Sequence, residues 1–480
     1  MTESHEVPVR FARLPRRGLL LGLSTPRVAC LAASLALLIP SVFLTGVAGA
    51  LLTLPLWLTV GSAAVARWHR RPIIEWAPTV GHFVQRRLAG QTRFRARVDR
   101  PRPTGTLALP GDAAAMRFVI DTDTRRAMLH DPHAKTLTAV ACVRHPAFVL
   151  LSTDEQARRV CGWSRALAHL ATTGSGSRVQ VLEISIPDGG HGINNWWAAH
   201  RASRANPWVT AQYDELVATV VPASATHRTL VALSIDTRSS HSSSRAHGRG
   251  LTAAAALLQQ EMASLTASLR AADLRVESWL GEHELAATFR TAYQPGFETG
   301  DHPAQSLERA GPVSMDEQWD HLHHDNGYST VLWISEWPRV DAPPSFLHTL
   351  IFQQGVRQTV SITYEPVPAD EAMRDIRRAR VEYATDAHQK AKLGMISDLA
   401  DSVEARDVTD RERSLVAGHA DIRFTGLITL TATTLADLEA AAAETARAAT
   451  QCGCETRRLY GQQARAFTAA ALPIARKVSP

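Results

Sequence analysis

The sequence predicts an α+β protein in which a two-helix transmembrane hairpin precedes two cytosolic domains with ferredoxin-like folds. Three observations lead to this prediction: a long uncharged segment near the N-terminus, short β-branched segments that recur along the rest of the chain, and amphipathic helical patterns between them. Hydrophobic residues make up 45% of the 480 residues and charged residues 20%, as in globular folds. A disordered or collagen-like chain is therefore excluded.

The uncharged segment covers 38 residues, 28–65. A single helix of that length would extend about 57 Å, nearly twice the thickness of about 30 Å of a bilayer's hydrocarbon core. We therefore expect two spans, residues 28–44 and 47–65, with a turn at residues 45–46. A secretory signal peptide is a poorer match, because its apolar core has only about 7–15 residues.

Positive charge is concentrated on both sides of this segment. Residues 1–110 carry 15 arginines and four carboxylates, whereas the rest of the chain carries 37 basic and 42 acidic side chains. Basic flanks stay in the cytoplasm, so we expect a multi-pass plasma-membrane protein with both termini cytoplasmic. Basic residues beside a span are attracted to lipid headgroups; those expected here are Arg67, Arg70, Arg71, Arg86 and Arg87.

The remaining chain repeats a strand–helix–strand order about four times, and two such units form one ferredoxin-like sandwich. Helices cover one face of such a sheet, so we expect the other face to be open for docking. The expected segments are a basic cytoplasmic tail at 1–27, the hairpin at 28–66, a basic juxtamembrane segment and linker at 67–104, a first domain at 105–290, a linker at 291–325 and a second domain at 326–475.

Motifs of common catalytic and metal sites do not occur in the sequence. A P-loop requires a Gly-Lys pair, and none is present; a Gly-x-Ser-x-Gly nucleophile turn is also missing. The adjacent histidines His321, His323 and His324 cannot easily converge on one ion. Five cysteines in 480 residues suit a reducing compartment. We therefore expect no catalytic residue, no cofactor and no metal, and a protein that is not an enzyme.

One segment keeps an enzymatic alternative open. Residues 188–197 combine three glycines with Asp188, His191, two asparagines and paired tryptophans. Glycines permit close approach of the backbone to a ligand, and tryptophans can stack on one. A packed loop anchored by its aromatic residues explains the same pattern. A membrane-tethered enzyme acting on a lipid or wall precursor would need a deep polar pocket here.

A second aromatic segment, residues 330–339, is typical of a strand that ends at a proline. Alternation places Leu332, Ile334 and Glu336 on one face, with Trp333 on the other. Two interpretations remain: the tryptophans pack in the core, or Trp333, Glu336 and Trp337 contact a partner, because tryptophan is a frequent interface anchor.

Several of these motifs resemble an actinobacterial family of uncharacterised integral membrane proteins encoded beside conjugation-type secretion ATPases. The resemblance covers nearly the whole chain. It rests on the basic N-terminus with its hairpin and on the sequences Ala-Leu-Pro-Gly at 108–111, Trp-Ile-Ser-Glu-Trp-Pro-Arg at 333–339, Val-Ala-Gly-His-Ala at 416–420, Leu-Tyr-Gly-Gln-Gln at 459–463 and Ala-Ala-Ala-Leu-Pro at 469–473. The family's hairpin is similar to PrgI-type membrane subunits of type IV secretion. Its soluble part is similar to the N-terminal, non-motor domain of the secretion ATPase.

The resemblance implies a non-catalytic membrane scaffold of a type IV-like secretion apparatus that docks a separate P-loop ATPase at the cytoplasmic face. The expected partners are the lipid bilayer, the secretion ATPase, other secretion subunits and further copies of the chain, without sequence-specific binding of nucleic acid. The alternatives are an EccE-like membrane subunit of a type VII secretion complex and the membrane-tethered enzyme.

Overall fold

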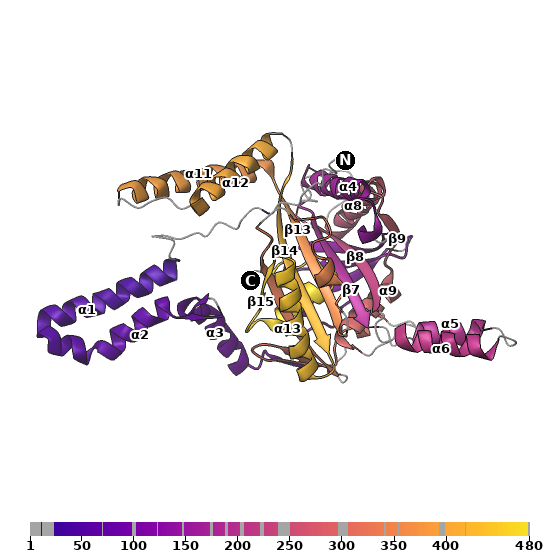
Figure 1. Ribbon diagram of the computed structural model, residues 1–480, viewed down its shortest axis with the longest axis horizontal. Coiled ribbons are helices and arrows are strands. Elements are labelled where there is room, and N and C mark those ends of the chain that lie inside the picture. Colours follow the sequence, from indigo (N-terminus) through magenta and orange to yellow (C-terminus); the bar gives the residue numbers. More distant parts are fainter. Residues whose placement is uncertain are drawn as a thin grey trace. The chain divides into compact units, whose positions relative to one another are not determined.

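The chain forms two compact units. The anchor unit comprises Leu14–Thr92 with Tyr460–Gln462, and the sheet unit comprises Met1–Arg13, Arg93–Leu459 and Gln463–Pro480. The computed structural model describes residues 11, 24–69, 71–97, 102–121, 123–145, 148–172, 176–187, 191–201, 206–220, 225–238, 250–295, 306–339, 342–353, 355–392, 399–417 and 419–478. Figure 1 labels the elements within each unit.

The anchor unit begins with two apolar helices, α1 (Thr25–Leu52) and α2 (Leu54–Val65). Gly46 interrupts α1 with a φ of 65° and a ψ of −155°. The two helices run antiparallel, because Arg27 Nε donates to the carbonyl oxygen of Ala64 at 3.0 Å and Ser34 Oγ donates to that of Trp57 at 2.8 Å.

The prediction of a second membrane span is wrong. Of the described helices, one part, Thr25–Leu44, is long and apolar enough to cross a membrane, as a single span or a signal sequence would be. The expected second span, 47–65, is divided at Thr53, and the helix that follows has 12 residues, about 18 Å. Pro55 explains the division, because proline has no amide hydrogen and favours the first turn of a new helix.

The rest of the anchor unit is a small two-stranded sheet followed by a helix. Strands β1 (Arg67–Trp68) and β2 (Arg71–Pro72) pair antiparallel, and α3 (Ile73–Leu88) follows. The ring of Tyr460 lies among the rings of Trp68, His69 and Trp76, with centroids 4.9–5.8 Å away. This aromatic cluster joins the residues after α2 to the loop Tyr460–Gln462.

The sheet unit is an α+β structure built on one 13-stranded antiparallel sheet, and the predicted fold class is confirmed at this level. The strands are β3 (Arg93–Arg95), β4 (Arg117–Ile120), β5 (Ala127–Asp131), β6 (Thr136–Arg144), β7 (Arg178–Pro187), β8 (Ala225–Asp236), β9 (Arg275–Trp279), β10 (Ser314–Glu317), β11 (Leu322–His324), β12 (Gly327–Glu336), β13 (Arg357–Val367), β14 (Asp421–Ala432) and β15 (Glu455–Arg458). Their order is β3-β10-β11-β12-β14-β13-β7-β8-β6-β5-β4, with β15 beside β12 and β9 beside β6.

Ten α-helices are described in this unit. They are α4 (Thr153–Thr172), α5 (His191–His200), α6 (Pro207–Val220), α8 (Leu251–Ala271), α9 (Glu282–Tyr293), α10 (His348–Ile351), α11 (Ala369–Lys392), α12 (Leu399–Val416), α13 (Leu435–Gln451) and α14 (Gln463–Ala471).

The same order of elements occurs twice along the sheet unit. The first repeat is β6–α4–β7–β8–α8–β9, and its strands lie in the order β9-β6-β8-β7. The second repeat is β12–α10–β13–β14–α13–β15, with the equivalent order β15-β12-β14-β13. The repeats meet where β7 pairs with β13. Each repeat also carries a helix pair between its second and third strands, α5–α6 in the first and α11–α12 in the second.

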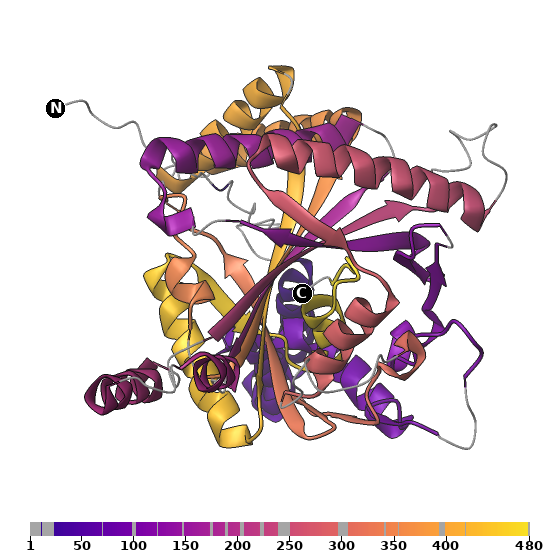
Figure 2. The ribbon, with the colours of Figure 1, turned by 90° about the vertical axis from the view of Figure 1, so that its right-hand side faces the viewer.

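Helices cover one face of the sheet in both repeats. Leu258, Met262 and Leu265 of α8 pack in one apolar cluster with Val231 and Leu233 of β8, and α4 contributes to the same cluster. In the second repeat α10 and α13 cover an equivalent cluster. Figure 2 shows α4 and α8 side by side along the sheet.

The opposite face is not open, which corrects the expectation from the sequence. A third cluster buries residues of α9, α14 and the C-terminal segment 472–478 against both repeats. Gln180 of β7 fixes this layer: its Nε2 donates to the carbonyl oxygen of Ala469 at 2.8 Å, and its Oε1 accepts from the amide of Ala475 at 2.6 Å. Docking surfaces must therefore lie elsewhere than on a bare sheet.

Candidate docking surfaces

The structure places the three predicted contact residues of β12 and its exit on different surfaces. The predicted alternation is observed: Leu332 and Ile334 belong to the cluster under α13, whereas Trp333 packs against the cluster on the opposite face. Glu336 is half-buried and forms an ion pair with Arg339. Contact of these residues with a partner remains a prediction.

Trp337 has a packing role in the second repeat. Its ring lies 5.2 Å from the ring of Phe424 and 5.1 Å from that of Phe11. It also covers Gly426 of β14, where an added Cβ would come within 2.7 Å of the indole. A glycine at this position is therefore what lets the tryptophan lie on the strand.

The juxtamembrane arginines belong to the anchor unit. Arg67 and Arg87 are exposed, and Arg71 and Arg86 are half-buried. Arg70 lies outside the described residues. Arg67 is the first residue of β1 and Arg71 is the first residue of β2, whereas Arg86 and Arg87 lie in the last turn of α3.

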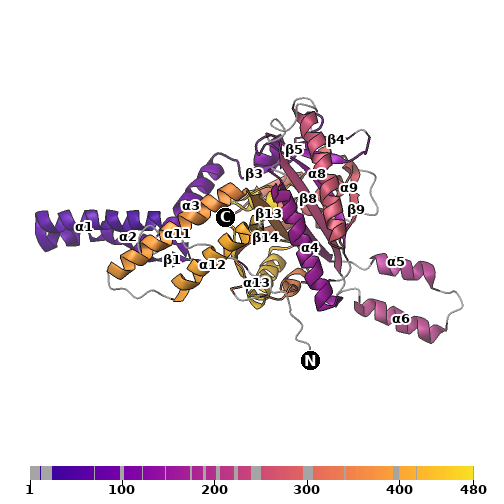
Figure 3. The ribbon, with the colours of Figure 1, turned by 90° about the horizontal axis from the view of Figure 1, so that it is seen from above.

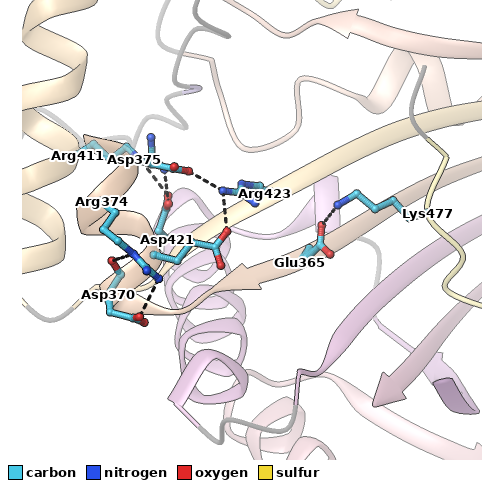
Figure 4. Close-up of polar contacts among 9 residues, drawn as sticks. Glu365, Asp370, Arg374, Asp375, Arg411, Asp421, Arg423 and Lys477 are labelled. Atoms are coloured by element: carbon cyan, nitrogen blue, oxygen red, sulfur yellow. Dashed lines mark hydrogen bonds and ion pairs between the residues drawn. The ribbon is translucent and has the colours of Figure 1, made fainter. Parts of the chain in front are cut away.

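Ion pairs fix the base of the α11–α12 pair, which we term the charged arm (Figure 4). Arg423 of β14 contacts Asp375 at 2.6 Å and Glu371 at 3.2 Å on α11. Arg411 of α12 pairs with Asp421 at the start of β14. Burial would lower the pKa of Arg423, but its hydrogen bond to Asp375 and the charges of both carboxylates raise the pKa overall. The arm is thus anchored to the strand that follows it.

The two helices of the charged arm are also joined to each other. Arg380 of α11 donates to Glu412 of α12 at 2.7 Å, and both side chains are partly exposed. The next ion pair along the sheet, between Lys477 and Glu365 at 2.7 Å, attaches the C-terminal segment to β13. Exposed ion pairs contribute little stability. Away from its base, the arm therefore has charged side chains at its surface that are available to a partner.

The α5–α6 pair projects from the sheet in two views (Figures 1 and 3), and we term it the aromatic arm. No described side chain of α5 or α6 is buried. One aromatic contact joins the helices: the rings of Trp197 and Tyr213 stack at 5.0 Å, and Trp197 Nε1 donates to Asp214 Oδ1 at 2.7 Å. Trp196 and Trp208 remain 60% and 69% exposed.

The aromatic arm includes the segment for which the sequence left an enzymatic alternative open. Residues 191–197 form helix rather than a packed loop. Asp188 lies outside the described residues, and the side chains of His191 and Asn195 are not described. A surface cavity of about 420 Å³ lies elsewhere, between β4, β5 and the start of α8, and is lined by Arg117 and His130 among others.

A polar cluster at one end of β6, β7 and β8 was missed from the sequence. The hydroxyl of Thr229 donates to Glu183 and lies 3.1 Å from Nε2 of His145, while His227 Nδ1 lies 3.8 Å from Glu183. Sequence gives no signal for the cluster, because pairing of three strands brings its members together.

The histidines of residues 321–324 have separate partners. His324 is buried, with Nδ1 2.7 Å from the carbonyl oxygen of Tyr293 and Nε2 2.7 Å from Ser329 Oγ, and burial lowers the pKa of His324 to about 4. His323 instead stacks on Tyr328. Across the described part of the chain, no group of three histidine, cysteine or acidic residues could hold a metal ion.

Searches against known proteins leave the family of this chain undetermined. No protein-family model matches the sequence, and no curated protein matches it.

Proposed function

We propose that this protein is a membrane-anchored, non-catalytic scaffold of a type IV-like secretion apparatus that docks a separate P-loop ATPase at the cytoplasmic face. The observation that carries the proposal is the combination, in one chain, of an exposed apolar helix of spanning length with a large sheet that bears two helical arms. The described residues of the two arms form exposed surfaces rather than a pocket with converging polar groups. The sequence contains no P-loop, so ATP hydrolysis would come from the partner.

The proposed location is the plasma membrane, with both termini in the cytoplasm. Helix α1 supplies the spanning segment. The antiparallel return through residues 47–65 is divided at Thr53 and is not a second continuous span, and we propose that it brings the chain back to the face from which it entered. The flanking arginines favour the cytoplasmic side for that face. A reporter active only in the cytosol should therefore work after residue 480 and be silent at Thr45. Activity at only one end of α1–α2 would instead indicate a single crossing.

The proposed fold family of each repeat is ferredoxin-like. Both repeats have the βαββαβ order, and both place the fourth strand beside the first and the second strand at the seam. Many activities occur on this fold, so it supports the scaffold function only weakly. The helical arms carry the argument because they are insertions into this common core.

The charged arm is the proposed ATPase-docking element. Its ion pairs with β14 orient it, and its exposed charges suit a specific but separable contact. Other subunits of the apparatus and further copies of the chain are also proposed partners.

The test is a detergent pull-down of the full-length protein with identification of its partners. We expect a P-loop secretion ATPase to co-purify, and to be lost when residues 369–417 are replaced by a short Gly/Ser linker. The control replaces residues 188–224, the equivalent insertion of the first repeat, and should retain the ATPase. Recovery of the pore proteins of a type VII complex would favour the EccE-like alternative. A monomer that retains a lipid or metabolite would favour the enzyme.

A further inference from the structure

The aromatic arm exposes large parts of its apolar side chains to solvent, although Tyr213 stacks on Trp197 and Trp196 stacks on His200. On α6, Val209, Tyr213 and Leu216 are 41%, 50% and 54% exposed. Their spacing of four and three residues places them on one face of the helix. The further exposed apolar residues are Ile193, Trp196 and Trp208. Exposed apolar side chains gathered on one helix pair mark an interaction site.

The equivalent insertion of the second repeat lacks this character. The charged arm buries Ala372 and Ile376 at its base and forms ion pairs with β14, so it is attached to its own repeat. The described residues of the aromatic arm carry one arginine and two carboxylates, Arg201, Asp214 and Glu215. The two arms therefore occupy equivalent places in the chain but present different chemistry.

We propose that the aromatic arm inserts its tryptophans into the interfacial layer of the lipid bilayer in which α1 is embedded. Tryptophan and tyrosine are the residue types enriched at membrane interfaces, and the low charge of the arm indicates contact by apolar insertion rather than by attraction to anionic lipid. A patch of this size would bind a bilayer weakly alone. Because α1 holds the protein at the bilayer, the effective concentration of lipid for the arm is high, and weak insertion is enough to keep the arm bound. The inference rests on the proposed membrane anchoring.

The test uses full-length protein in phosphatidylcholine nanodiscs, with or without brominated acyl chains, which quench tryptophan on contact. The fluorescence removed by the double substitution Trp196→Phe, Trp208→Phe is the contribution of the two exposed tryptophans, which we term the arm contribution. We expect brominated lipid to lower that contribution about two-fold or more. The matched control is Trp333→Phe: the indole of Trp333 packs against the apolar cluster that both repeats share, so its contribution should be equal in both lipids. Phenylalanine at the exposed positions leaves the helices intact.

Two outcomes would overturn the inference. An arm contribution that is equal in both lipids but quenched by aqueous acrylamide would place the tryptophans in water. A contribution quenched by neither agent would place them against protein, either a partner or a second copy. Membrane anchoring is tested separately: if the protein fails to incorporate into nanodiscs, the anchor proposal fails, whereas incorporation without quenching of the arm overturns the arm inference alone.

Discussion

At the residue scale, buried polar side chains join parts of the chain that are distant in sequence. Asp131 of β5 has a side chain only 3% exposed, and its Oδ2 accepts from Arg476 Nε at 2.7 Å. Its Oδ1 accepts from the amides of His133 and Ala134. Burial would raise the pKa of Asp131, but the hydrogen bond from Arg476 and those two amides lower it overall. Asp131 is therefore held as a carboxylate in the folded protein.

Asp131→Asn should destabilise the sheet unit in a pH-dependent way. Removing one partner of a buried ion pair costs about 3 kcal/mol when the other is left unpaired. Arg476 would keep its contacts with Asp112, so we expect a smaller loss here. A carboxyl whose pKa is lowered on folding stabilises above its unfolded pKa of about 3.9, and this stabilisation is lost as the pH falls through the folded pKa. Denaturant unfolding of both proteins in detergent from pH 7 to pH 3 should show the difference shrink below about pH 4. A constant difference would contradict the assignment.

At the element scale, the layer of α9, α14 and the C-terminal segment determines which surfaces remain available for docking. Gln180 lies at the centre of the sheet. Its side-chain amide donates to the carbonyl oxygens of Ala469 and Leu472 and accepts from the amide of Ala475. It is itself fully buried, and it also donates to Ser361 of β13 across the seam between the repeats. A single side chain thus links both repeats to the covering layer.

Gln180→Met should loosen that layer while keeping the volume of the side chain. The carbonyl oxygen of Ala469 and the amide of Ala475 would lose this partner, at about 1–3 kcal/mol each, whereas the carbonyl oxygen of Leu472 still accepts from the amide of Ile474. We therefore expect a loss of a few kcal/mol. Amide exchange should speed up in residues 469–478 before it does in α8, on the opposite face. Gln212→Met, at an exposed position of α6, is the matched control and should change neither stability nor exchange. Unchanged exchange at Ala475 would show that the bond does not hold the layer.

At the scale of the whole molecule, the two repeats share one sheet and one apolar cluster. Leu182 of the first repeat and Val331 and Leu427 of the second belong to the same cluster as Phe467 of α14. The residues expected to form a linker, 291–325, contribute β10 and β11 to the sheet. Each repeat has its own apolar cluster under its helices, but the cluster on the opposite face of the sheet belongs to both repeats.

Unfolding of the sheet unit should therefore be a single transition. Strand pairing at β7–β13 and the common cluster would be lost together, and a unit that unfolds cooperatively shows coincident transitions by different probes. Near-ultraviolet circular dichroism and amide exchange of β8 and β14 should give the same midpoint in denaturant. Separate midpoints for β8 and β14 would mean that each repeat unfolds independently.

Local patterns in the sequence determined the class of this fold and the type of many of its elements. The apolar segment, the βαβ order and the capping residues Ser152 and Thr434 act over a few residues, and helices begin at both caps. The sequence also contained the signal that divides the second apolar segment, because Pro55 starts a new helix. The predicted alternation of Leu332 and Ile334 against Trp333 in β12 is observed, since strand alternation is local as well.

Tertiary structure alone decided how these elements combine. The seam between β7 and β13, the closure of the second face and the grouping of Thr229 with His145 and Glu183 depend on pairs far apart in the chain; Gln180 and Ala475 are separated by 295 residues. Such contacts form only when packing offsets the entropy of bringing distant segments together, and no local pattern records that balance. Exposure of the aromatic arm has the same origin, because whether a tryptophan is buried or exposed depends on which distant segments pack on it.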